Sequence, residues 1–353
     1  FNAIDSLISR DTSKFFSTTF LAKFDSSGNC IRYSKVYEGL NLTNHNINLE
    51  AFNQEPVFNV FTSLDTISIL SKSSIINFAP NAHNNNLILR FSENFDSIKL
   101  FKSIDVGNRA GLSILSLNVF QNKIYFSGYY GGYANIGGKN FKSSYSNPGW
   151  KGIIGAMDLK GNITNISQIN PDTTQSDIIQ DFSVIDSSHF YIVGLVQDSF
   201  YYGGKWYSSP GKSKIHNAVR SYPYVALVSF QKAYWVQIAY NKFNDSYYGY
   251  TYYGICRHDK QKNLYAMFEQ GENPIIIGGL KDTVSASYGF VKLDSLGNAL
   301  WIRSHQSKNY SIFQSLVILI NNQIAYTGRY TDSISLFPLK LKSRGSQHGS
   351  FIT

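Results

Sequence analysis

Two groups of residues in this sequence have types and spacings that could bind a ligand: three Asp-x-x-Gly-Asn turns and a region dense in tyrosine. The turns comprise Asp25 and Gly28, Asp158 and Gly161, and Asp294 and Gly297. An Asp at the first position can accept hydrogen bonds from backbone N–H groups further along, and Gly can adopt a positive φ that closes a hairpin. A calcium loop would need several oxygen ligands at alternating positions and an acidic last ligand, which these segments lack. We therefore interpret them as structural turns.

The tyrosine-rich region comprises residues 201–207 and 247–253. Aromatic side chains have flat apolar faces that pair with sugar rings, and tyrosine is favoured at protein interfaces. The same side chains could equally fill space between neighbouring repeats, and the sequence leaves both interpretations open. The candidate ligand-binding aromatics are Tyr201, Tyr202, Trp206, Tyr207, Tyr247, Tyr248 and Tyr250.

No other set of residues is typical of a catalytic, cofactor or metal site. The seven histidines include no His-x-His or His-x-x-x-His pair, and Cys30 and Cys256 are far apart in the sequence. No Gly-x-Ser-x-Gly segment or phosphate-binding Gly-rich loop is present. We therefore predict a non-enzymatic protein that needs no cofactor and no metal.

Composition indicates an all-β protein. The 353 residues include 25 Tyr and 25 Phe, which suit half-buried strands, while Gly, Asn and Ser suit the turns between them. The net charge is +9, but only 16% of residues are charged and the basic ones are scattered, which argues against a nucleic-acid partner. No apolar run reaches about 18 residues, so we expect no transmembrane helix.

A repeat of strand, turn and strand organises the whole chain. Its anchor positions are Asp25, Ser92, Asp158, Ser229 and Asp294, spaced 65 to 71 residues apart, although the Ser92 and Ser229 copies lack the Asp-x-x-Gly pattern. Each repeat has room for four short strands, the content of one propeller blade. We predict a single β-propeller array over residues 1–353 with about six four-stranded blades, the first and last incomplete. The approximate units are 1–58, 59–121, 122–187, 188–261, 262–321 and 322–353.

The phase of the two ends leads to a further expectation. The sequence begins with Phe1 and stops inside a repeat. We therefore expect this chain to be part of a larger protein or complex, in which further sequence or a partner strand completes the blades.

The repeat resembles the SBBP-type β-propeller repeat of bacterial proteins. The residues that carry the resemblance are Tyr125, Gly128, Gly137, Gly138, Phe290, Val291, Lys292, Leu293, Asp294, Gly297, Asn298 and Trp301. The resemblance implies an extracellular or cell-surface propeller, often within a large multidomain protein, and it implies no single activity. The composition is also similar to that of surface and secreted proteins of Bacteroidota, which are often exported through type IX secretion.

These observations lead to one main expectation and two alternatives. The main expectation is a non-catalytic scaffold for adhesion or protein interaction, associated with the bacterial outer membrane or secreted, whose partners are envelope or surface proteins or glycans. The first alternative is a secreted carbohydrate-binding or carbohydrate-active propeller. The second is a partner of a secretion machinery, held in a complex by a strand donated from another chain.

Overall fold

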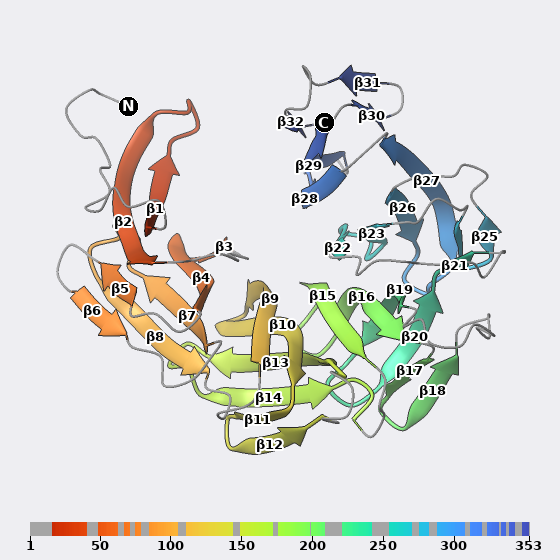
Figure 1. Ribbon diagram of the computed structural model, residues 1–353, viewed down its shortest axis with the longest axis horizontal. Helices are drawn as coiled ribbons and strands as arrows, with labels where there is room; N and C mark the ends of the chain where they lie inside the picture. The colour runs from red at the N-terminus through yellow and green to blue at the C-terminus, as the bar shows by residue number, and fades with distance from the viewer. Residues whose placement is uncertain are drawn as a thin grey trace. The chain divides into compact units, whose positions relative to one another are not determined.

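The computed structural model describes eighteen segments of the chain. They are residues 16–40, 49–62, 67–70, 75–78, 85–104, 111–143, 149–171, 176–197, 199–208, 221–241, 254–269, 275–281, 288–307, 311–319, 323–331, 333–336, 339–342 and 348–352. They form 32 β-strands and no helix (Figure 1). A search of these segments found no helix long and apolar enough to cross a membrane.

The chain forms two compact units. The first contains residues 1–148 and 155–165, and the second contains residues 149–154 and 166–353. The boundary passes through strand β13, Lys151–Asp158.

Four sets of four strands share one antiparallel order, in which the four main strands of a repeat follow one another and a hairpin is inserted between the second and third; the last set is part of a six-stranded sheet. This is the strand order of a propeller blade. The four are β3 (Leu49–Phe52), β4 (Glu55–Thr62), β7 (Asn85–Phe91) and β8 (Ile98–Ile104); β9 (Gly111–Phe120), β10 (Lys123–Gly131), β13 and β14 (Ile163–Gln168); β15 (Asp177–Val184), β16 (Phe190–Gln197), β19 (Ser221–Val228) and β20 (Ala233–Ile238); and β22 (Gly254–His258), β23 (Leu264–Glu269), β26 (Tyr288–Leu293) and β27 (Ala299–Ser307).

A fifth four-stranded sheet has the order β1 (Phe16–Phe24), β2 (Cys30–Leu40), β5 (Ile67–Leu70) and β6 (Ile75–Phe78). Besides its inserted hairpin, the last repeat contributes three described main strands, β28 (Ser311–Ile318), β29 (Ile324–Thr331) and β32 (His348–Ile352). The described residues therefore form a β-propeller arrangement with five four-stranded blades, and the expected count of about six was wrong. The strand pattern of the last repeat led to the overcount, because its fourth strand has no counterpart in the described part of the chain.

Five hairpins are inserted into the repeats, and three of them pair with a strand of the repeat before. They are β5–β6; β11–β12 (Tyr133–Ile136, Lys139–Lys142); β17–β18 (Ser199–Tyr202, Lys205–Ser208); β24–β25 (Ile275–Ile277, Leu280–Lys281); and β30–β31 (Ser333–Leu336, Leu339–Lys342). Backbone pairing joins β5 to β2, β24 to β21 (Tyr240–Asn241) and β30 to β27. In each case the partner strand belongs to the end of the preceding repeat, so the hairpin hydrogen-bonds two successive repeats together.

Three of these hairpins turn on a Gly-Gly pair. Residues 137–138, 203–204 and 278–279 are all glycines, with φ between 55 and 82°. Positive φ at both central positions is the requirement of a type I′ turn, which matches the twist of the flanking strands. The first glycine of each pair is also crowded: a Cβ on Gly203 would lie 2.3 Å from the Gln231 carbonyl oxygen. The Gly-Gly stretch noted in the sequence is therefore a hairpin tip packed against the rest of its own repeat.

The repeated Asp turns are held by their own side chains. Asp158 Oδ1 accepts hydrogen bonds from the backbone N–H groups of Lys160 and Asn162 at 2.8 and 2.9 Å, and Oδ2 accepts one from Asn162 Nδ2 at 2.8 Å. Asp25 and Asp294 make the same three bonds. Hydrogen bonds from the following Asn, the largest influence, lower the pKa of each carboxyl.

The two degenerate copies keep the turn by other means. Ser229 Oγ accepts hydrogen bonds from the backbone N–H groups of Gln231 and Lys232 at 3.2 Å. Ser92 Oγ accepts two in the same way, while Phe95 takes the glycine's place at a φ of 59°. A serine hydroxyl offers the same acceptor as Asp at shorter reach, so the hairpin forms where the sequence pattern is lost.

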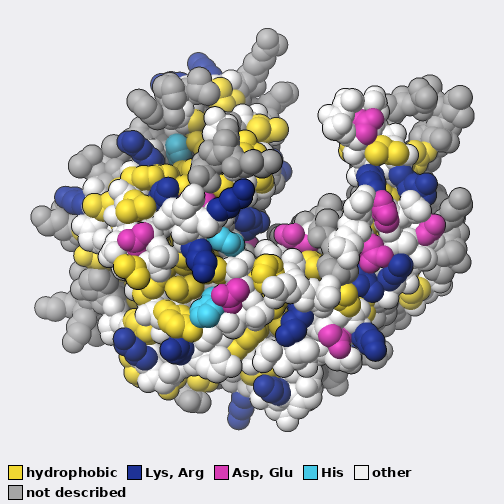
Figure 2. All heavy atoms as spheres, turned by 180° about the vertical axis from the view of Figure 1, so that it is seen from behind, with side chains coloured by type: hydrophobic (Ala, Val, Ile, Leu, Met, Phe, Trp, Pro, Cys, Tyr) yellow, Lys and Arg dark blue, Asp and Glu magenta, His cyan; other side chains and the backbone are white. Residues whose placement is uncertain are grey.

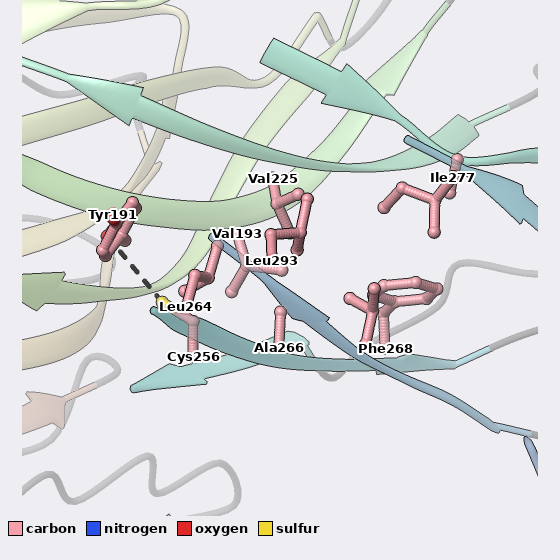
Figure 3. Close-up of a cluster of buried hydrophobic side chains, with 11 residues drawn as sticks. Tyr191, Val193, Val225, Cys256, Leu264, Ala266, Phe268, Ile277 and Leu293 are labelled. Carbon is pink, nitrogen blue, oxygen red and sulfur yellow. Dashed lines mark hydrogen bonds between the residues drawn. The ribbon is translucent and has the colours of Figure 1, made fainter. Parts of the chain in front are cut away.

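The core of the second unit lies between successive blades. Tyr191 and Val193 of β16 and Val225 of β19 pack against β22, β23 and β26, as Figure 3 shows. Cys256 of β22 is fully buried there, and its thiol lies 3.7 Å from the Tyr191 carbonyl oxygen. Tyr191 also donates a hydrogen bond from its hydroxyl to the Lys262 carbonyl at 2.6 Å. These two successive blades of the second unit thus share one hydrophobic core.

Candidate functional site

The hairpin β17–β18 carries four of the seven aromatics that the sequence singled out. Its register places Tyr201 opposite Trp206, and Phe200 opposite Tyr207. Because side chains alternate across a strand, these cross-strand pairs face opposite sides of the hairpin. The tyrosine-rich segment is thereby divided into an inner and an outer face.

The inner face anchors the hairpin to its blade. Tyr202 is 2% exposed and donates a hydrogen bond from its hydroxyl to the Ser229 carbonyl at 2.8 Å. Burial raises the pKa of this phenol far above its usual value. Tyr207 donates from its hydroxyl to the Ala233 carbonyl at 3.3 Å, and Phe200 packs 4.8 Å from the Tyr224 ring. Tyr202 and Tyr207 therefore support the hairpin, and Tyr202 is not available to a ligand.

The outer face presents an aromatic pair to solvent. The rings of Tyr201 and Trp206 lie 4.8 Å apart between centroids at 45°, and Trp206 is 53% exposed. Lys205 pairs with Tyr202 and therefore lies on the Tyr207 side of the hairpin, where it is exposed and its Nζ lies 4.9 Å from the centre of the Tyr207 ring. An indole exposed to this degree, supported by a second ring, has the geometry of a stacking platform.

The start of β20 adds a second exposed aromatic beside this hairpin, and Figure 1 shows β18 next to β20. Tyr234 is 43% exposed, and Lys232 Nζ lies 4.6 Å over its ring. His189 Nε2 lies 2.8 Å from the Tyr234 hydroxyl, while Nδ1 lies 2.9 Å from Asp186 Oδ1. The His189 ring therefore bridges the Asp186 carboxylate and the Tyr234 hydroxyl.

Asp186 is held ionised in this chain of hydrogen bonds. Partial burial alone would raise its pKa, but hydrogen bonds from Ser188 and His189 outweigh that and lower the pKa to about 2. The chain Asp186–His189–Tyr234 consequently fixes the orientation of an exposed tyrosine next to a lysine. We use the name aromatic–lysine surface for the part-exposed and exposed side chains that the hairpin and the start of β20 present on their two sides, namely Tyr201, Lys205, Trp206, Lys232 and Tyr234.

The other three candidate aromatics, Tyr247, Tyr248 and Tyr250, lie outside the described residues. The lysines and arginines visible in Figure 2 are scattered over that face among other side-chain types. In the described part of the chain, no group of three or more His, Cys, Asp or Glu residues is placed to hold a metal ion.

The structure also assembles a polar cluster that sequence reasoning missed. Asp181 of β15 accepts hydrogen bonds at Oδ2 from the backbone N–H of Cys256, at 2.9 Å, and from Arg257 at 2.7 Å. Two residues further along, Ser183 Oγ lies 2.8 Å from His258 Nδ1. Burial is the main cause that lowers the pKa of His258. The sequence signal for this cluster was a set of polar residues at alternate positions of an apolar strand. It did not identify their partners, which are more than 70 residues away.

Comparison with known proteins gives limited information. No protein-family model and no curated protein matches the chain. Among solved structures, a protein from Bacteroides ovatus named as a hydrolase covers 82% of this chain and 79% of its own, at 7% identity and a TM-score of 0.36. A europium-containing methanol dehydrogenase covers 77% of this chain and 66% of its own, at 10% identity and a TM-score of 0.34. At these identities and scores neither match carries an activity over to this chain, and the resemblance to the SBBP repeat stays a prediction.

Proposed function

We propose that this chain is a non-catalytic β-propeller interaction module that contacts its partner through the aromatic–lysine surface. The observation that carries the proposal is the exposure of Trp206 on the outer face of a hairpin whose inner face is buried and hydrogen-bonded. Exposed Trp and Tyr on a rigid support are the residues that dominate interfaces, because they bury large areas while losing little conformational entropy.

The surroundings of Ser183 support a non-catalytic function. Ser183 and His258 form the hydrogen-bonded pair that a nucleophile and its base require, but Ser183 is only 4% exposed. The pair also belongs to the contact between β15 and β22. A structural part in that contact accounts for it, and a substrate could not reach a serine buried to this degree.

The resemblance to the SBBP repeat and the surface chemistry support a partner class. We propose a location at a bacterial cell surface or among secreted proteins, in a larger envelope assembly, with a protein partner. The second candidate is carbohydrate recognition, which is favoured by the flat Tyr201–Trp206 pair and by the exposed Tyr234 ring, since sugar rings stack on such faces.

A comparison of two variants tests the proposal. Purified protein and the variants Trp206→Ala and Leu296→Ala are immobilised and exposed to envelope extract, and each is also applied to a glycan array. Leu296 is 75% exposed and lies in another repeat, so it controls for the loss of an exposed apolar side chain. We expect retained proteins to fall at least about tenfold with Trp206→Ala and to be unchanged with Leu296→Ala.

The remaining outcomes are equally decisive. Saturable binding to a defined glycan, lost in Trp206→Ala and with no retained protein, would reject the protein scaffold in favour of the second candidate. Equal binding by wild type and both variants would reject the aromatic–lysine surface as the contact site.

A further inference from the structure

Asp186, His189 and Tyr234 place a carboxylate, an imidazole and a phenol in hydrogen-bonded order. His189 Nδ1 lies 2.9 Å from Asp186 Oδ1, and His189 Nε2 lies 2.8 Å from the Tyr234 hydroxyl. Covalent catalysis uses a nucleophile within about 2.6–3.2 Å of a base that a third group orients, and tyrosine is among the residues that serve as the nucleophile. These three residues therefore have the geometry for a chemical step.

The turn between β15 and β16 fixes the carboxylate and the imidazole. Asp186 Oδ1 accepts hydrogen bonds from the backbone N–H groups of Ser188 and His189 at 2.8 and 2.9 Å, and from Ser188 Oγ at 2.9 Å. His189 Nδ1 also lies 2.9 Å from Asp186 Oδ2 and 3.0 Å from Ser188 Oγ. The phenol comes from β20 of the same blade, and its ring centroid lies 5.0 Å from that of the imidazole. The base is thus held by a tight turn and faces the phenol across one blade.

The phenol is open to a reactant. Tyr234 is 43% exposed, whereas Ser183, which lies beside His258 in the buried cluster, is 4% exposed. Lys232 Nζ lies 4.6 Å over the Tyr234 ring. A positive charge in that place stabilises the negative charge that builds up on the phenol as its proton leaves. Access and charge therefore favour reaction at Tyr234 and not at Ser183.

We propose that Tyr234 is an acceptor site that takes one acyl group from an aryl ester or a thioester. The Tyr234 oxygen attacks the carbonyl carbon while His189 Nε2 takes the phenolic proton. The bond from that carbon to the leaving oxygen or sulfur then breaks, and His189 returns the proton to the departing atom. The products are an O-acyl tyrosine and a free phenol or thiol, with no change of oxidation state. Each chain accepts one acyl group, so this is a modification site and not a site of turnover.

Asp186 is a positioning residue in this step, which uses the neutral imidazole with its proton on Nδ1. An ionised carboxylate only accepts hydrogen bonds, so it matches that form of the ring and leaves Nε2 to face the phenol. Partial burial opposes ionisation of Asp186, but the hydrogen bonds from Ser188 and His189 outweigh it and lower the pKa to about 2. The carboxylate is therefore present at neutral pH.

Acetylation by p-nitrophenyl acetate tests the site in the wild-type protein, without any binding partner. Tyr133 is an internal control, because it is 40% exposed and, in the part of the chain that the structure describes, no imidazole is hydrogen-bonded to its hydroxyl. Peptide mapping by mass spectrometry after brief incubation measures the acetyl group at each tyrosine. Hydroxylamine, which cleaves tyrosine esters and leaves lysine amides intact, identifies the O-acetyl groups.

We expect Tyr234 to be acetylated at least about a hundredfold faster than Tyr133, which is the lower end of what a positioned base contributes. Equal rates at the two tyrosines would overturn the proposal, and this comparison needs no variant to fold. It is also independent of the proposed protein contact, since a chain that captures no partner can still be acetylated.

Two variants identify the nucleophile and the base. Tyr234→Phe should abolish the fast phase of nitrophenol release, and a fast phase that persists would make His189 the nucleophile and overturn the proposal. His189→Gln should slow acetylation of Tyr234 to the rate of Tyr133 and leave Tyr133 unchanged. An unchanged rate at Tyr234 in His189→Gln would also overturn it.

The pH profile tests the part of Asp186. Acetylation of Tyr234 should slow as the pH falls, because a protonated imidazole cannot accept the phenolic proton. In Asp186→Asn the charged imidazole loses its counter-charge, so this fall should move to lower pH. A rate that is lower at every pH, with the profile in the same place, would show a merely structural loss and would overturn the positioning part.

Discussion

Asp181 Oδ2 accepts a hydrogen bond from the backbone N–H of Cys256 at 2.9 Å and so fixes β15 to β22, 75 residues further along the chain. The same oxygen receives Arg257 at 2.7 Å, and the Asp181 side chain is 9% exposed. A single carboxylate oxygen of β15 therefore accepts hydrogen bonds from two consecutive residues of β22.

Asp181→Ala should therefore destabilise the protein strongly. It leaves the Cys256 N–H without an acceptor and Arg257 without its counter-charge, and we expect a loss of about 2–4 kcal/mol in the free energy of unfolding. Asp181→Asn keeps an oxygen for Cys256 and should lose roughly half as much. Urea unfolding of both variants measures the difference. Equal losses in the two variants would show that packing, and not the hydrogen bond, fixes the strands.

The Gly-Gly tip of β17–β18 gives a matched pair of substitutions. Gly203 and Gly204 both have a positive φ, but only Gly203 is crowded, and the space around Gly204 is open. Gly204→Ala should cost about 1 kcal/mol for the backbone alone, and Gly203→Ala should cost about 1–3 kcal/mol more for the clash with Gln231. Thermal and urea unfolding of the two variants would separate the cost of the backbone conformation from the cost of the clash. A smaller cost at 203 than at 204 would contradict the packed position of the tip.

A lysine stands where the repeated turn elsewhere uses glycine. Lys262 has a φ of 63°. The Asp259 carboxylate accepts hydrogen bonds from the backbone N–H and the side-chain amide of Asn263, as the aspartates of the Asp-x-x-Gly turns do from their own Asn. Lys262→Gly should relieve the strained conformation and stabilise the protein by up to about 1 kcal/mol. Lys260→Gly, at a position without positive φ, should stabilise nothing and serves as the control in the same unfolding measurement.

Asp186 predicts a specific dependence of stability on pH. Its pKa is lowered from 3.8 to about 2 in the folded protein. A carboxyl whose folded pKa is depressed stabilises the fold above its unfolded pKa and loses that contribution as the pH falls through the folded value. The stability difference between wild type and Asp186→Asn should consequently be constant above 3.8 and shrink as the pH falls toward about 2. A difference that stays constant throughout that range would show that the carboxylate is not held by Ser188 and His189.

The turns show how far local sequence reaches. Asp25, Asp158 and Asp294 bond to groups within four residues, so their type and spacing alone predicted hairpins there. The all-β class followed in the same way from alternation and turn residues. Ser92 and Ser229 mark the limit of the pattern: they make the same turn with a different acceptor, and the repeat spacing identified them although they lack the Asp-x-x-Gly motif.

The tertiary structure decided everything that depends on which strand meets which. The sequence placed Tyr201, Tyr202, Trp206 and Tyr207 in one aromatic cluster, but only the register of β17 with β18 separates an exposed pair from two anchoring tyrosines. The number of four-stranded blades and the meeting of His189 with Tyr234 depend equally on pairing between segments distant in sequence. Contacts of that kind are selected by the packing of whole strand faces, and the free energy of that packing is shared among many residues. No single spacing in the sequence therefore encodes which strands pair.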